Sequence, residues 1–300
     1  SHDKIMLPFY IFYSMFGFQR IGDLAWAAAD SQARGFLLGA TSGRTTLAGE
    51  GLQHQDGHSH VLSSTIPNCK SYDPTFDYEL AVILLDGLNK MYIENENVFY
   101  YITIANENYL HPPLPPGVER GIKKGMYLLN EGGDSERRVQ LLGSGAILRE
   151  VIEAAKLLEQ DFDVSADIWS VTSFTELARE GRDHRRLAML QPQETAGLSY
   201  VEECLAHRQG PVIASTDWVR TYAEQIREFV PRRYKVLGTD GFGRSDTRKK
   251  LREFFEIDRH YVVLAALHAL MEEGEVGKEK VEEAIRRYQI NVKRPSPSVA

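Results

Sequence analysis

The polar side chains best suited to chemistry are concentrated in one glycine-rich segment, residues 49–60. This segment contains Glu50, His54, His58 and His60, so three of the nine histidines fall within seven positions. A carboxylate beside imidazoles can transfer protons near neutral pH or offer hydrogen bonds to an anionic substrate. Because residues 41–60 carry many glycines and no stable period, we predict a long, ordered loop there.

An aromatic segment near the amino end predicts the first structural element. Residues 8–13 form a continuous apolar run, as expected of a parallel strand that is covered on both faces. Ser14 can cap a helix over residues 15–30, where apolar side chains recur mostly every three or four positions. A buried strand so close to residue 1 suggests that its natural neighbours in the sheet lie outside this chain.

These two segments predict one shared pocket. In open α/β sheets, ligands bind beyond the carboxyl ends of the strands, where the following loops meet. We therefore expect Tyr13 and Phe16 to form an aromatic wall and the His54–Glu50 segment to form a polar rim. The alternative is that the aromatic residues of this region are mostly core.

Three other patterns have a chemical and a structural interpretation. His54, His58 and His60 could bind zinc, but their spacing matches no helical pair, and we favour histidines that hydrogen-bond to the backbone. Ser144 between two glycines could cradle a phosphate, but a tight strand-to-helix turn is favoured. Residues 239–246 form a polar turn before a helix, and we favour a loop at a domain or subunit seam over a catalytic role.

Strand-like and helix-like segments alternate along the chain, which predicts the α/β class with two doubly wound units. Further strands are predicted at residues 36–40, 97–104, 139–142, 166–171, 211–215 and 234–237. Helices are predicted at residues 77–88, after 145, after a cap at Thr172 or Ser173, at 217–229, from a cap at Asp258 to 271, and at 278–288. The proline-rich segment after residue 105 predicts a boundary, and we expect a tag remnant (1–2), a first domain (3–108), a linker (109–137) and a second domain (138–300).

Composition limits the classes of function. The chain has 300 residues and a net charge of -7, the wrong sign for a nucleic-acid-binding protein. Its apolar runs are too short to span a membrane, so we expect no membrane contact. Cys69 and Cys204 have no paired spacing, which fits a reducing, cytoplasmic location.

Several segments resemble one enzyme family. Residues 12–60 are similar to the homodimeric pyruvate dehydrogenases, the thiamine-diphosphate-dependent first component of the bacterial pyruvate dehydrogenase complex. The further matching segments are IPNCKSYDP, YYITIANENY, VQLLGSGAILREV, SVTSFTELARE and VLGTDGFGRSD. The resemblance covers essentially the whole chain and implies the carboxyl-terminal third of such an enzyme, a truncated pyrimidine-type thiamine-diphosphate-binding domain followed by a transketolase C-terminal-like domain.

The resemblance also implies a cofactor and roles for individual residues. Phe16 would pack on the aminopyrimidine of thiamine diphosphate, Tyr13 and His54 would face pyruvate and its adduct, and Arg20 and Glu50 would lie in the same pocket. Magnesium and diphosphate ligands are absent, because the chain has no Gly-Asp-Gly motif, so we assign no metal ligand. The glutamate that protonates the pyrimidine is also missing. We therefore expect the chain alone to be inactive and to bind the cofactor negligibly.

The implied partners are a second copy in a homodimer, pyruvate, and the lipoyl acyltransferase component that receives the acetyl group. Two alternatives remain open. One is ketol transfer of the transketolase type, although the segment Asp56-Gly57-His58 lacks the Pro-Thr that usually follows Asp-Gly in transketolases. The other is a non-catalytic module for dimerisation or partner docking.

Overall fold

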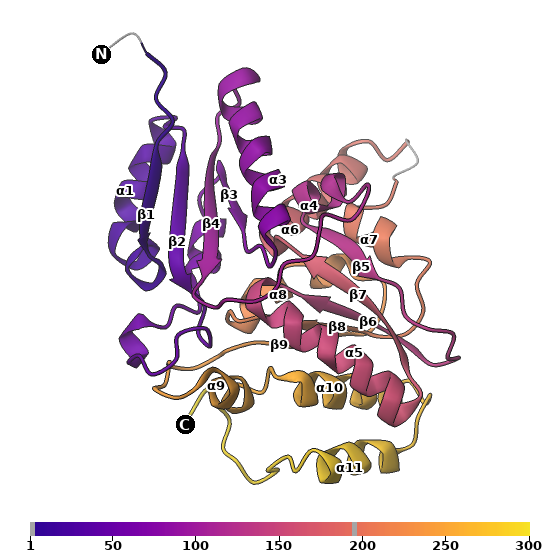
Figure 1. The fold of residues 1–300 in the computed structure, drawn as a ribbon. Coiled ribbons are helices and arrows are strands. Elements are labelled where there is room, and N and C mark those ends of the chain that lie inside the picture. The colour runs from indigo at the N-terminus through magenta and orange to yellow at the C-terminus, as the bar shows by residue number, and fades with distance from the viewer. Residues whose placement is uncertain (1–3, 194–196) are drawn as a thin grey trace.

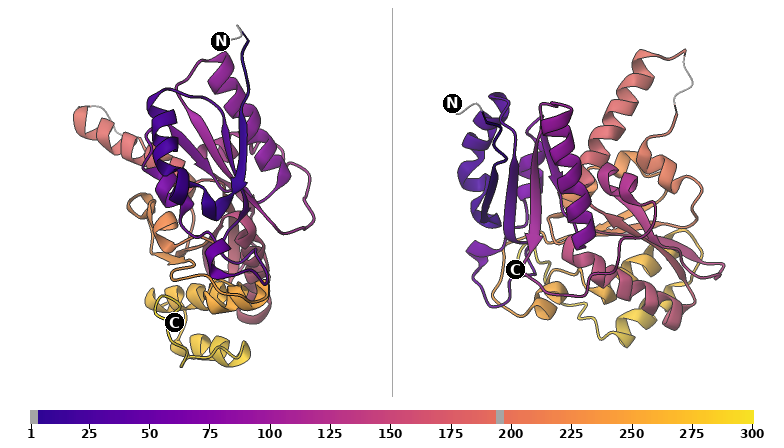
Figure 2. Two further views of the ribbon diagram at one scale, coloured as in Figure 1. Left: turned by 90° about the vertical axis from the view of Figure 1, so that its left-hand side faces the viewer. Right: turned by 45° about the horizontal axis from the view of Figure 1, so that its top comes forward.

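The computed structural model describes residues 4–193 and 197–300. They form two α/β units, each built on a sheet in which most neighbouring strands are parallel (Figure 1). The predicted α/β class is therefore confirmed. The views in Figure 2 keep the carboxyl-terminal helices at the opposite end of the molecule from the first strand.

The first sheet has the order β1-β2-β4-β3, and all of its pairings are parallel. Its strands are β1 (Phe9–Tyr13), β2 (Phe36–Ser42), β3 (Cys69–Tyr72) and β4 (Phe99–Ala105). The helical segments of this unit are η1 (Ser14–Phe16), α1 (Phe18–Asp30), η2 (Leu52–His54), α2 (Ser59–Ser64), α3 (Asp77–Leu88) and η3 (Asn89–Ile93). Successive residues of β4 belong to different clusters, Tyr101 with Phe18 of α1 and Tyr100 with Ile83 of α3, so helices cover both faces.

The second sheet has the order β5-β7-β6-β8-β9, in which only β5 is antiparallel to its neighbour. Its strands are β5 (Met126–Asn130), β6 (Arg138–Gly143), β7 (Ser165–Val171), β8 (Val212–Ser215) and β9 (Tyr234–Leu237). The helical segments are α4 (Glu119–Lys124), η4 (Gly145–Ile147), α5 (Leu148–Phe162), α6 (Phe174–Leu190), α7 (Tyr200–Leu205), α8 (Arg220–Glu224), η5 (Arg227–Phe229), α9 (Arg248–Phe254), α10 (Arg259–Glu272) and α11 (Lys278–Arg287). Leu141 packs in a cluster with α5 and α10 residues, while Leu142 packs in one with α6 and α8 residues, so this sheet is also covered on both faces.

The first strand differs from its prediction in burial. β1 is the outermost strand of its sheet, and Phe9, Tyr10 and Ile11 are 47%, 54% and 64% exposed. The prediction of a strand covered on both faces is therefore wrong for this chain. An apolar run indicates a strand, but it does not say whether a neighbour is present to cover it.

The connections contain more regular structure than predicted. Helix α2 begins at Ser59, inside the predicted loop, and both α4 and β5 lie within residues 109–137, where β5 pairs with β7. Ser14 does not cap the helix that follows β1, because α1 begins after Gly17 without a side-chain cap. Two other predicted helix caps are confirmed. The Ser173 side chain accepts a hydrogen bond at the start of α6, and the Asp258 side chain does so at the start of α10.

The two units share buried polar contacts. The Glu79 carboxylate of α3 accepts hydrogen bonds from the backbone amides of Thr75 (2.6 Å) and Phe76 (3.0 Å) within its own unit. It also accepts them from the hydroxyls of Tyr127 (2.7 Å) and Ser170 (2.6 Å), which belong to the second sheet. Glu79 is fully buried, so this carboxylate depends on donors from both units.

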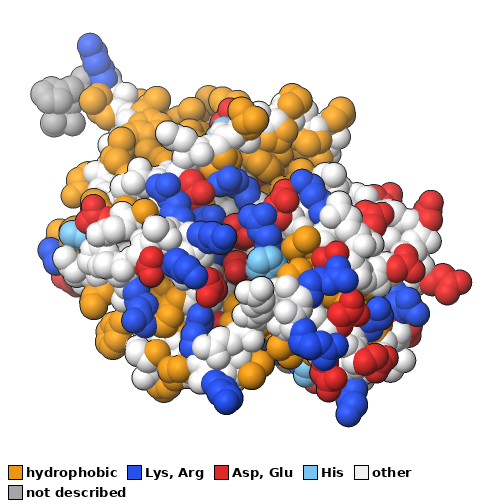
Figure 3. Space-filling model, turned by 60° about the horizontal axis from the view of Figure 1, so that its bottom comes forward, with side chains coloured by type: hydrophobic (Ala, Val, Ile, Leu, Met, Phe, Trp, Pro, Cys, Tyr) orange, Lys and Arg blue, Asp and Glu red, His pale blue; other side chains and the backbone are white. Residues whose placement is uncertain are grey.

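The surface shows no grouping of charge by sign on the face that Figure 3 draws, where Lys, Arg, Asp and Glu side chains are intermixed. Within the described residues, every helix is too short or too polar to cross a membrane.

Candidate functional site

The loops after β1 and β2 bring three predicted side chains together. Tyr13 is the last residue of β1, Phe16 lies in η1 and His54 lies in η2. The ring centroids are 5.4 Å apart for Tyr13 and Phe16, 5.3 Å for Tyr13 and His54, and 5.5 Å for Phe16 and His54. Because β1 and β2 are parallel neighbours, their carboxyl ends lie at one edge of the sheet, and the loops that follow converge there.

Arg20 and Glu50 lie beside this aromatic group. The Arg20 guanidinium is 4.2 Å from the Phe16 ring centroid, in a cation–π arrangement. A Glu50 carboxylate oxygen lies 3.0 Å from Nδ1 of His54, yet this Nδ1 has no aligned hydrogen-bond partner among the described residues. We name this group of five residues the ring site: Tyr13, Phe16, Arg20, Glu50 and His54.

The ring site contains a hydrogen-bond donor and a polar rim. Burial, supported by the nearby Glu50, raises the pKa of Tyr13 above its usual value of 10.0, so the Tyr13 hydroxyl keeps its proton at neutral pH. The His54 side chain is 29% exposed and that of Glu50 is 47% exposed, so the polar rim opens to solvent. The arrangement can hold a flat ring and direct donors at an anionic group.

Ser14 and Asp56 form a buried polar contact beneath the ring site, which the sequence did not predict. The Ser14 hydroxyl donates a hydrogen bond of 2.5 Å to Asp56, and the amides of His58 and Ser59 donate to the same carboxylate at 3.1 Å each. Asp56 thus joins the segment after β1 to the start of α2. Its position one turn before a helix is the signal that could have identified it.

The three histidines of the loop do not form a metal site. His60 is fully buried, and its two ring nitrogens contact the hydroxyls of Ser71 (2.6 Å) and Thr103 (3.0 Å), while burial lowers its pKa to about 3. Burial also lowers the pKa of His58. Across residues 4–193 and 197–300, no group of three or more His, Cys, Asp or Glu side chains is arranged to hold a metal ion.

Asp73 and Asp217 are buried where the carboxyl ends of the two sheets meet. Asp73 follows β3 and accepts hydrogen bonds from Ser144 (3.0 Å) and Trp218 (2.8 Å) of the second unit. Asp217 follows β8 and accepts one from the amide of Thr45 (3.1 Å) of the first unit. Burial raises the pKa of Asp73 to about 6 and that of Asp217 to about 7. Sequence reasoning missed both, since single aspartates after strands are common in loops.

Ser144 and residues 239–246 serve as structural connections. The Ser144 hydroxyl is fully buried, bonding to Asp73 and lying 2.9 Å from the Thr216 hydroxyl, as fits a tight turn rather than a phosphate cradle. In the 239–246 loop, the backbone of Arg244 hydrogen-bonds to Gln55 of the first unit. The prediction of a loop at a seam between units is therefore confirmed.

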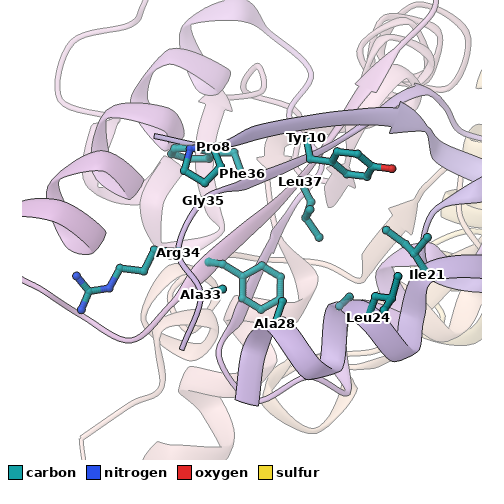
Figure 4. A pocket seen from close by; sticks show the side chains of 12 residues that line it. Pro8, Tyr10, Ile21, Leu24, Ala28, Ala33, Arg34, Gly35, Phe36 and Leu37 are labelled. Carbon is teal, nitrogen blue, oxygen red and sulfur yellow. The ribbon is translucent and has the colours of Figure 1, made fainter. Parts of the chain in front are cut away.

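An apolar groove of about 300 Å³ lies between β1 and α1, outside the ring site (Figure 4). Tyr10 of β1, Leu37 of β2 and Leu24 of α1 are among its lining residues. None of the five ring-site residues lines this groove.

Comparison with known proteins relates both units to enzymes. Residues 1–112 match the family described as the pyruvate dehydrogenase E1 component middle domain, and residues 125–258 match the transketolase-like TK C-terminal domain. The pyruvate dehydrogenase E1 component of Cupriavidus necator is 62% identical over 99% of this chain and 33% of that protein. That of Pseudomonas aeruginosa is 63% identical over 99% of this chain and 34% of that protein. A transketolase structure from Campylobacter jejuni has a TM-score of 0.64 at 21% identity, covering 88% of this chain and 36% of that chain, and shows the fold alone.

The chain therefore spans about a third of the length of the curated relatives it matches. The sequence resemblance to pyruvate dehydrogenase E1 components is confirmed, and so is the transketolase-like character of the second unit. The roles of individual ring-site residues, and the domain limits at 108 and 137, stay predictions.

Proposed function

We propose that this chain is part of a thiamine-diphosphate-dependent pyruvate dehydrogenase. Its residues 1–112 belong to the pyruvate dehydrogenase E1 component middle-domain family, and its residues 125–258 belong to the transketolase-like C-terminal family. In this proposal the complete enzyme decarboxylates pyruvate oxidatively and transfers the acetyl group to the lipoyl group of an acyltransferase component. The observation that carries the proposal is the convergence of Tyr13, Phe16 and His54, with ring centroids 5.3–5.5 Å apart.

The ring site fits the aminopyrimidine half of thiamine diphosphate. Phe16 and Tyr13 offer aromatic surfaces to a flat ring, and the imidazole of His54 lies against both of them. Arg20, held against Phe16, adds a positive charge at the edge of this surface. When bound, the cofactor would supply the electron sink that decarboxylation requires.

The chain's own contribution would be to orient pyruvate and to stabilise negative charge. Tyr13 keeps its proton, so its hydroxyl can donate to the substrate carboxylate or to a developing oxyanion. His54 can donate a hydrogen bond from its ring, with the Glu50 carboxylate 3.0 Å from its Nδ1. Such donors act most strongly where water is excluded. The rim of the ring site is exposed in this chain, so water would be excluded only when another part of the enzyme covers it.

Magnesium does not fit the residues described here, because no group of three or more His, Cys, Asp or Glu side chains among them is arranged to hold a metal ion. Magnesium and the diphosphate would be bound by the remaining two thirds of the enzyme, and in a homodimer by the opposite subunit. We therefore propose that the chain alone neither decarboxylates pyruvate nor binds the cofactor with useful affinity. Calorimetric titration with thiamine diphosphate and magnesium should show no micromolar binding.

Complementation in trans tests the proposal. The 300-residue chain is mixed with the amino-terminal part of a relative's E1 component, and release of carbon dioxide from pyruvate is measured with cofactor, magnesium and an artificial electron acceptor. Turnover of pyruvate is expected only with both parts, and consumption of a ketose phosphate instead would support ketol transfer. In the complemented enzyme, His54→Ala should lower kcat by about a hundredfold. His268→Ala, on the distant helix α10, is the matched control and should leave kcat unchanged.

The proposal fails if the complemented enzyme turns over neither substrate while circular dichroism shows both parts to be folded. It also fails if His54→Ala and His268→Ala have the same kcat.

A further inference from the structure

The segment that carries Glu50 and His54 is bound to the second unit at both ends and at Gln55. We name residues 49–57 the His54 segment. The amide of Gly49 donates to the Asp246 carbonyl (3.0 Å), and the Ser245 hydroxyl donates to the carbonyl of Glu50 (2.7 Å). At the other end, the amide of Val219 donates to the carbonyl of Gly57 (2.7 Å). Both ends of the His54 segment are therefore fixed by groups from outside its own unit.

Gln55 makes the central attachment, one residue after His54. Its Oε1 accepts a hydrogen bond from the amide of Arg244 (2.7 Å), and its Nε2 donates to the carbonyl of the same residue (2.7 Å). Nε2 also donates to the Leu47 carbonyl (3.1 Å), within the first unit. Gln55 is 1% exposed, so its carboxamide hydrogen-bonds to the backbone of the second unit in a site closed to water.

The close approach of the two chains depends on a glycine in the opposite loop. A Cβ added at Gly243 would lie 2.5 Å from Oε1 and 2.9 Å from Cβ of Gln55, and 3.1 Å from the backbone Cα of Leu52. The positions of Gln55 and Leu52, one on each side of His54 in the segment, therefore require glycine at position 243. A side chain there would push the two loops apart.

The ring of His54, in contrast, lies against side chains of the first unit in the ring site. It lies against Tyr13 and Phe16, and Glu50 is its charged neighbour. Thus the second unit binds the backbone around His54, while the ring of His54 packs against side chains of the first unit. A 1 Å error in the backbone position would change both ring distances, which is the range in which catalytic geometry is lost.

We propose that Gln55 is a positioning residue, and that the second unit acts through its 239–246 loop to hold His54 in the ring site. The second unit then has a role in the reaction without contributing a catalytic residue. The relevance of this positioning role to pyruvate turnover rests on the proposed function. The role of Gln55 in placing His54 does not depend on that function.

Hydrogen exchange in the 300-residue chain tests the placement directly. In Gln55→Ala, the amides of the His54 segment should exchange roughly ten- to a hundredfold faster than in the unchanged chain, because three hydrogen bonds are lost. Gln140→Ala is the matched control. Gln140 is also fully buried and makes three polar contacts, with Asp167 (2.8 Å), the Gln209 carbonyl (3.0 Å) and Trp169 (2.9 Å), inside the second unit.

A general loss of stability would loosen the His54 segment equally in both variants, whereas the proposed attachment predicts the effect in Gln55→Ala alone. Unchanged exchange in Gln55→Ala, or equal acceleration in Gln140→Ala, would overturn the proposal. Gly243→Ala approaches the same contact from the other side and should also accelerate exchange. Its control is Gly22→Ala in α1, where an added Cβ meets open space.

The complemented enzyme supplies a second readout. Gln55→Ala should lower kcat/KM for pyruvate about tenfold and shift the pH profile of pyruvate turnover, while Gln140→Ala should change neither beyond its effect on the folded fraction. If the unchanged enzyme turns over no pyruvate, the proposed function fails and the exchange experiment still decides the placement. If it turns over pyruvate and Gln55→Ala matches it in both rate and pH profile, the positioning role fails alone.

Discussion

Replacing Asp73 with asparagine should remove a pH dependence from the stability of the folded chain. The buried Asp73 carboxylate accepts hydrogen bonds from Thr103 (2.7 Å), Ser144 (3.0 Å) and Trp218 (2.8 Å). Burial nevertheless raises its pKa from 3.8 to about 6, against the opposite effect of these three donors. The folded chain therefore keeps the proton at pH values where the unfolded chain has lost it.

The sign and size of the effect follow from this difference in pKa. Between pH 3.8 and about 6 the folded state binds more protons than the unfolded state, so the free energy of unfolding falls as the pH rises. The contribution of Asp73 is complete below pH 3.8 and is lost once the pH has passed about 6. At 1.36 kcal/mol per pKa unit, the change amounts to about 3 kcal/mol.

Asparagine fits the same site without leaving a buried group unpaired. Its Oδ1 can take the place of the oxygen that accepts from Ser144 and Trp218, and its Nδ2 can donate to the Thr103 hydroxyl. The Thr103 hydroxyl already lies 3.3 Å from the Tyr72 carbonyl, which can accept its proton. The variant therefore replaces a titrating group by a neutral one of nearly equal shape.

Urea unfolding followed by far-ultraviolet circular dichroism, at several pH values from about 4 to about 8, measures the effect. The stability of the unchanged chain relative to Asp73→Asn should fall by most of that 3 kcal/mol, about 2 kcal/mol or more, across this range. Asp30→Asn, at an exposed position at the end of α1, controls for the loss of one negative charge. A difference that stays constant with pH, or that grows as the pH rises, would refute the argument that burial dominates at Asp73.

Three further predictions concern stability and ionisation. Arg252→Ala should lower the free energy of unfolding by about 1–3 kcal/mol in urea, because Glu107 and Glu150 lose a buried arginine that they share and keep only their more exposed partners, Arg149 and Arg259. Ile83→Ala should lower it by about 2–5 kcal/mol in the same assay, because Ile83 is 1% exposed in the core between α3 and the first sheet. The ring of His60 should stay neutral down to about pH 4 in a proton–carbon NMR titration, because burial lowers its pKa to about 3; stability should accordingly fall as the pH drops below the unfolded value of 6.5.

Each of these three predictions has a matched control variant or a result that would contradict it. Arg286→Ala removes an exposed cation 4.0 Å from Glu282 and should cost less than about 1 kcal/mol, so an equal loss in both arginine variants would contradict the importance of burial. Ile93 is 74% exposed, and Ile93→Ala should be nearly neutral beside Ile83→Ala. A His60 titration with a midpoint near 6.5 would show that its ring is reached by water.

Elements with strong local signals could be predicted closely from the sequence. The bounds of α3 and β9 agree with their predictions, and the caps at Ser173 and Asp258 lie where the sequence indicated. In each case the information is local: an apolar period, a short apolar run, or a side chain that accepts from the first turn of a helix.

Elements that depend on distant partners could not be predicted. Strand β3 has the mixed sequence CKSY, and it is a strand because it pairs with β4, thirty residues further along the chain. Strand β5 lies in a segment rich in proline and glycine, and its pairing with β7 determines its conformation. Composition also could not reveal that β1 is exposed, because burial depends on what lies beside the strand.

The ring site and the buried polar residues around it divide in the same way. Tyr13, Phe16 and His54 follow predicted strand ends, so the general rule for open sheets brings them to one edge. Gln55, Asp56 and Asp73 were missed, because each acts through contacts made more than forty positions away, with Arg244, Ser14 and Ser144 respectively. Their residue types alone are those of ordinary surface loops.

The shared Glu79 carboxylate has a consequence for how this polypeptide can be divided. If the chain were cut between residues 109 and 118 and the pieces were made separately, the amino-terminal piece would keep the Thr75 and Phe76 amides but lose the Tyr127 and Ser170 hydroxyls. The Glu79 carboxyl group would then lack two of its four hydrogen-bond donors, and water would have to replace the hydroxyls of the missing piece. The two pieces should accordingly be obtained in soluble form only when they are synthesised together.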